Sequence, residues 1–148
     1  MSTSLKTKQA TLDAIKKWQP RLGLQAWAIH VTFDVDLETG TVMRGRPDEA
    51  RMVTQLEVRP NVEEMFFNYL TLEKTVLHEL VHCIVSGHDL DEWGYLTSSS
   101  MRKEEAEILY AGMKHQNELL TTRLCHLFWQ AYETTPWNPA QVLQAEGE

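Results

Sequence analysis

The HELVH segment at residues 78–82 has the HExxH pattern, whose residue types and spacing suit zinc chemistry. It lies in an apolar stretch whose spacing predicts a helix over residues 71–86, and positions i and i+4 of a helix lie on one face. His78 and His82 can therefore direct one ring nitrogen each at a single zinc ion. Glu79 is offset by about 100°, which places it beside the metal. There it can act as the general base for a water molecule that the metal activates.

Both histidines belong to a polar stripe on a helix that is otherwise largely apolar. The stripe consists of Thr71, Thr75, His78, His82 and Ser86. Burying two imidazoles and a carboxylate in such a helix is unfavourable unless hydrogen bonds or a metal ion satisfy them. The pattern therefore predicts one bound Zn²⁺ ion, with His78 and His82 as ligands and Glu79 as the catalytic residue.

Two arrangements compete for the third protein ligand. His88 stands ten residues after His78, the spacing of metzincin peptidases, although Val85 occupies the position where that spacing normally has a glycine. The other arrangement takes a glutamate from the following helix. Glu105 has apolar neighbours three and four residues away, whereas Glu104 projects further round that helix. We favour Glu105 as the third ligand and keep His88 as the alternative.

Helical periodicity and turn residues predict three helices in a single domain over residues 1–148. The first covers residues 4–19 and ends at Pro20, and the second is the helix that carries the histidines. The third runs over residues 101–133 and is followed by a loosely packed tail over residues 134–148.

Two stretches alternate between apolar and polar residues, which predicts strands over residues 27–35 and 50–58. A shorter strand is expected near residues 41–43, and Gly45 and Pro47 are interpreted as turn residues. The expected fold class is α+β. A small twisted β-sheet would pack against the N-terminal helix, the buried HExxH helix and a long C-terminal helix that carries the glutamate ligand.

Composition and charge limit the classes of function. The 148 residues include 14 basic and 21 acidic side chains, a net charge of −7, and nucleic-acid binding is not expected because it depends largely on neutralising phosphates. No stretch reaches the roughly 18 apolar residues of a membrane span, so no membrane partner is expected. Cys83 and Cys125 lie in apolar runs and are interpreted as buried thiols, which favours a reducing, cytoplasmic location.

The HELVH segment resembles zincin metallopeptidases, in particular the minimal gluzincin-like peptidases of bacteria and phages, including the ImmA/IrrE type. The resemblance extends to WAIHVTF at residues 27–33 and EEAEILYAG at residues 104–112. It implies a zinc-dependent hydrolase of peptide bonds in the cytoplasm, or in the host cytoplasm for a phage protein, with Glu105 closing the metal site. It also implies a protein or peptide substrate bound as an extra strand along a sheet edge, for which residues 50–58 are our candidate.

Two other interpretations are open at this point. The offsets of His78, His82 and His88 are also those of three-histidine metal endoribonucleases of the YbeY type, which HELVHCIVSGHD loosely resembles. The second is a zinc-containing interaction protein without turnover. A structural zinc site is normally closed by four protein ligands, whereas a catalytic site keeps one position open for water.

Overall fold

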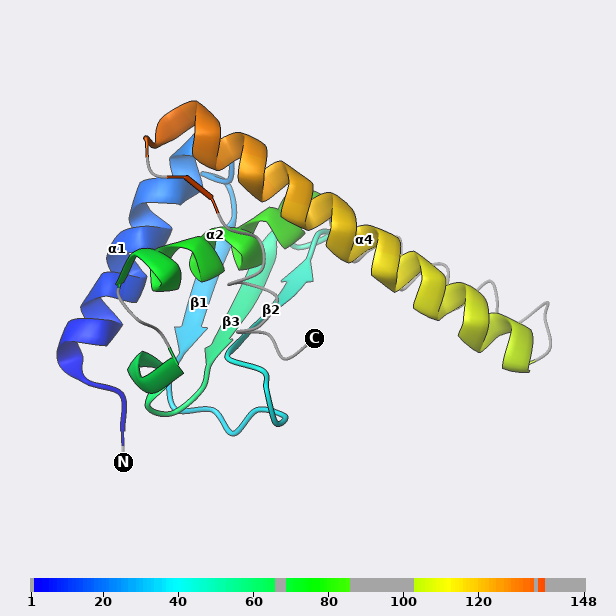
Figure 1. Ribbon diagram of the computed structural model, residues 1–148, viewed down its shortest axis with the longest axis horizontal. Helices are drawn as coiled ribbons and strands as arrows, with labels where there is room; N and C mark the ends of the chain where they lie inside the picture. Colours follow the sequence, from blue (N-terminus) through cyan, green and yellow to red (C-terminus); the bar gives the residue numbers. More distant parts are fainter. Residues whose placement is uncertain (1, 66–68, 86–102, 135, 138–148) are drawn as a thin grey trace.

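The computed structural model describes residues 2–65, 69–85, 103–134 and 136–137, and the fold is α+β as predicted. In chain order the elements are α1 (Leu5–Arg21), β1 (Ala28–Thr32), β2 (Met43–Asp48), β3 (Val53–Val58), the short 3-10 helix η1 (Val62–Met65), α2 (Tyr69–Val85) and α4 (Lys103–Tyr132). The helix α2 packs against β2, α1 and α4, while the N-terminal half of α4 extends past the other labelled elements (Figure 1).

All three predicted helices are present, with shifts of one or two residues at their ends. The N-terminus of α1 is capped by the Ser4 hydroxyl, which accepts a hydrogen bond of 3.2 Å from the Thr7 N–H. Pro20 does not end this helix but lies inside its last turn. Gly23 follows the helix with a φ of +71°, a conformation that glycine adopts easily and that commonly ends helices.

The sheet has the strand order β1-β3-β2, with β1 parallel and β2 antiparallel to β3. The alternation predicted over residues 50–58 is confirmed in β3, where Thr54, Leu56 and Val58 are buried. The prediction that this strand forms an edge is wrong. β3 is the central strand because β1 pairs with it on one side and β2 on the other.

The strand β2 lies at an edge of the sheet and was not predicted at its full length. Gly45 and Pro47, interpreted as turn residues, both lie inside it. Proline lacks an N–H and is tolerated on an edge strand where that side faces away from the sheet. The other edge strand, β1, ends after Thr32 because Asp34 adopts a left-handed conformation with a φ of 60°.

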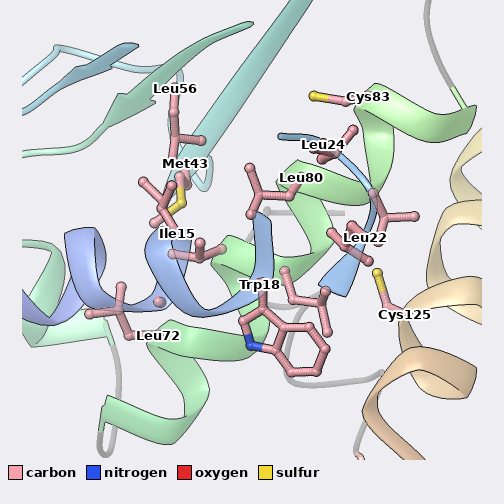
Figure 2. Close-up of a cluster of buried hydrophobic side chains, with 14 of the residues drawn as sticks. Ile15, Trp18, Leu22, Leu24, Met43, Leu56, Leu72, Leu80, Cys83 and Cys125 are labelled. Atoms are coloured by element: carbon pink, nitrogen blue, oxygen red, sulfur yellow. The ribbon is translucent and has the colours of Figure 1, made fainter. Parts of the chain in front are cut away.

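A core of buried side chains from α1, the sheet, α2 and α4 joins these elements, and Figure 2 shows part of it. Trp18 of α1 is fully buried and stacks on Trp129 of α4, with 5.7 Å between ring centroids. Trp137, which we expected in a loosely packed tail, is also buried, and the preceding Pro136 accepts a 2.8 Å hydrogen bond from Lys74. Among the described helices, none is both long enough and apolar enough to cross a membrane.

Candidate metal centre

The helix α2 brings the two histidines of the HExxH segment together, as the i, i+4 spacing predicts. Their ring centroids are 5.0 Å apart and their planes are nearly perpendicular. Possible ligand atoms of His78, Glu79 and His82 all lie within 4.8 Å of one another. His78 is fully buried, whereas the His82 side chain is 17% exposed. The site therefore opens on the side of His82.

The carboxylate that meets both histidines belongs to Glu118 of α4. One of its oxygens lies 3.1 Å from Nε2 of His78, and the other lies 2.9 Å from Nε2 of His82. An ionised carboxylate can only accept hydrogen bonds, so these contacts place a proton on each Nε2 atom. The Glu118 carboxylate thus bridges the two imidazole rings, and three potential ligand groups from two helices lie together.

Glu118 is held in its ionised form at this point. Burial alone raises the pKa of this carboxyl group, but the hydrogen bonds and charges of His78 and His82 outweigh it and lower the pKa well below its ordinary value. The group is therefore a carboxylate at neutral pH, the form that binds metal ions.

The second nitrogen of the His82 ring is oriented by α4 as well. The fully buried Thr121 hydroxyl donates a 2.8 Å hydrogen bond to the Asn117 carbonyl oxygen. Its single proton is then in use, so at its 3.4 Å contact with Nδ1 of His82 the hydroxyl acts as the acceptor. With Nδ1 as the donor to Thr121, Nε2 is the nitrogen that would exchange its proton, shared with Glu118, for a metal ion, an arrangement typical of histidine ligands.

Glu79 lies beside these groups and is held by the sheet. It is 5% exposed, and its Oε2 accepts a 2.9 Å hydrogen bond from the backbone N–H of Gly45 in β2. Its position agrees with the predicted offset of about 100° from the adjacent histidine.

The residues present fit a zinc ion. Two imidazoles and one carboxylate form a ligand set that zinc uses in catalytic sites. The Glu118 carboxylate already lies 3.1 Å from Nε2 of His78 and 2.9 Å from Nε2 of His82. A metal ion held by these residues would take the place of the two shared protons.

The structure does not bring Glu105 to the histidines. Glu105 is exposed in the first turn of α4, about 20 Å along the helix axis from Glu118. Its neighbours Ile108 and Leu109 are exposed as well, so the buried face inferred around Glu105 was wrong. Glu104 is exposed in the same turn, and His88 lies outside the described residues.

A signal in the sequence could have identified the site glutamate. The buried face of α4 carries residues at spacings of three and four: Glu118, Thr121, Cys125 and Trp129. Cysteine and tryptophan on this face indicate burial more strongly than the isolated apolar residues near the start of the helix.

The thiol of Cys83 is expected to be unreactive, although it follows His82 directly. Burial raises the pKa of Cys83 to about 11, with a lowering contribution from a hydrogen bond with Thr54 and a raising one from the charge of Glu79. Because the thiolate is the nucleophile, iodoacetamide should label Cys83 slowly between pH 7 and 9 in the native protein and rapidly once guanidinium unfolds it. Mass spectrometry of the peptide measures the labelling, and stoichiometric modification of the native protein at pH 8 would contradict the expectation.

Comparison with known proteins places these elements in a family. No match is found among curated proteins or among solved structures. The family model of the WLM domain, a zinc-metalloprotease-like domain, matches residues 43–132, from the start of β2 to the end of α4. This range contains both histidines of the site and the two glutamates beside them. Because the match covers more than half of the chain, this protein belongs to the WLM-domain family.

Proposed function

We propose that this protein is a zinc-dependent metallopeptidase that hydrolyses a peptide bond. The observation that carries the proposal is the contact of the Glu118 carboxylate with Nε2 of His78 and Nε2 of His82 in a half-buried site. Glu79 lies beside the two histidines. Membership of the WLM-domain family supports the same class of activity. The narrower resemblance to ImmA/IrrE-type peptidases stays a prediction.

The proposal gives each residue a separate role. His78, His82 and Glu118 hold the ion, and Glu118 takes the place that we expected Glu105 to occupy. When bound, zinc supplies Lewis-acid chemistry, polarising the scissile carbonyl and making a water molecule more acidic. Glu79 takes a proton from the water molecule while the water oxygen attacks the carbonyl carbon. Glu79 later returns this proton to the leaving amine nitrogen.

The proposed substrate is a protein or peptide. β2 is the sheet edge nearest the site, because Gly45 of this strand contacts Glu79 directly. The resemblance to zincins implies an extended substrate along a sheet edge, and β2 takes this role in place of the strand over residues 50–58.

A first test measures the metal itself. We expect protein purified without chelator to contain about one equivalent of zinc per chain by mass spectrometry of the metal. A chelator should abolish cleavage of a random-sequence fluorogenic peptide library, and added zinc should restore it. Zinc-free protein would contradict the central claim, whereas bound zinc without any cleavage would favour the zinc-containing interaction protein.

A further inference from the structure

We propose that Gly45 is a positioning residue for Glu79, a role that rests on the proposed function of Glu79 as the base. Two properties of Gly45 carry the proposal. Its backbone N–H donates the 2.9 Å hydrogen bond to Oε2 of Glu79. Its missing side chain leaves room for the carboxylate, since a Cβ atom at this position would lie 3.2 Å from the same oxygen.

The register of the sheet explains why this N–H is available. In an antiparallel pair, successive residues direct their N–H and C=O groups alternately toward the partner strand and away from it. The backbone N–H of Arg59 donates to the Val42 carbonyl, so the N–H and C=O groups of even-numbered residues in β2 face β3. The backbone N–H of Gly45, which lies opposite Leu56, therefore faces away from β3. Pro47, the next outward position, has no N–H. The Gly45 N–H is thus an edge donor directed at the base.

The hydrogen bond from Gly45 fixes one oxygen of Glu79 and so orients the carboxylate that acts as the base. A carboxylate on a flexible side chain samples several rotamers, and only some place an oxygen near the attacking water. A hydrogen bond from rigid backbone restricts this sampling, and a misplacement of about 1 Å can lower the rate of a catalytic step by about 100-fold. Gly45 therefore contributes to the rate through Glu79.

Substitution of Gly45 by alanine tests the steric part. Alanine is no worse than glycine in a strand, so the sheet should form, but the Cβ atom must displace Glu79 or β2. We expect a kcat that is about 3- to 10-fold lower, with zinc content close to wild type, for a fluorogenic peptide that the wild-type protein cleaves. Gly112→Ala is the matched control, because a Cβ there meets nothing within 4 Å. It should keep full activity and raise Tm slightly.

Amide hydrogen exchange tests the hydrogen bond independently of activity. The Gly45 N–H should be protected in the wild-type protein and exchange at least about 10-fold faster in Glu79→Ala. The Arg46 N–H, which faces β3, should stay protected in both.

The outcomes separate the two proposals. Full kcat in Gly45→Ala, or rapid exchange at Gly45 in the wild type, overturns the positioning role and leaves the peptidase proposal intact. A wild-type protein that cleaves no peptide overturns the peptidase proposal, and the role of Gly45 falls with it.

Discussion

Substitution of Glu118 by alanine is expected to lower zinc affinity by about 100-fold or more. Outer partners of metal ligands are themselves worth about 10- to 100-fold in affinity, and Glu118 is assigned as a direct ligand. Its carboxylate contacts Nε2 of both histidines, so its removal takes away one of three proposed ligands and one negative charge. Competition with a chromophoric chelator measures the affinity, and peptide cleavage should fall in parallel.

The matched control for this experiment is Glu105→Ala on the same helix. Glu105 is exposed, so its removal should leave zinc affinity and cleavage unchanged. Loss of zinc from Glu105→Ala with retention by Glu118→Ala would reverse the assignment. Loss from His88→Ala, with both glutamate variants unaffected, would instead move the protein to the three-histidine class.

The contrast between these two glutamates shows how far sequence reasoning reached in the metal site. The i, i+4 histidines and the offset of Glu79 depend on helix geometry alone, which is local, and their meeting was predicted correctly. The third carboxylate depends on where α4 crosses α2, and no local spacing fixes that crossing. Cys125 and Trp129 indicate the buried face of α4, which also carries Glu118. Glu105 lies on the part of α4 that projects from the core.

In the fold, too, local elements could be predicted from the sequence, whereas the pairing of distant segments could not. Strong periodicity identified the three helices and the strands β1 and β3, and burial in β3 follows the predicted alternation. Most of β2 was missed because Arg44, Gly45, Arg46 and Pro47 have little strand propensity. On an edge strand the low propensity is tolerated, and one of these residues serves the site: Gly45 contacts Glu79. Strand order involves pairing between distant segments, so the edge was assigned to the wrong strand.

Glu79→Gln is expected to abolish most hydrolysis while the protein keeps its zinc. An amide has nearly the same shape as a carboxylate and can still accept the hydrogen bond from the Gly45 N–H, so the side chain should stay in place. It cannot take a proton from water, and loss of a general base typically lowers kcat by about 10² to 10⁴-fold. Single-turnover cleavage of the fluorogenic peptide and the zinc content of the same sample provide the two measurements.

Stability distinguishes this loss from simple damage to the site. Glu79 is almost fully buried, and a buried carboxylate is more costly to desolvate than an amide. Tm of Glu79→Gln should therefore equal or exceed that of the wild type even though activity is lost, as expected where a site trades stability for function. Glu104→Gln, an exposed change of the same kind, should alter neither property. Undiminished cleavage by Glu79→Gln would exclude Glu79 as the base, and Glu118 would be the next described carboxylate to test for that role.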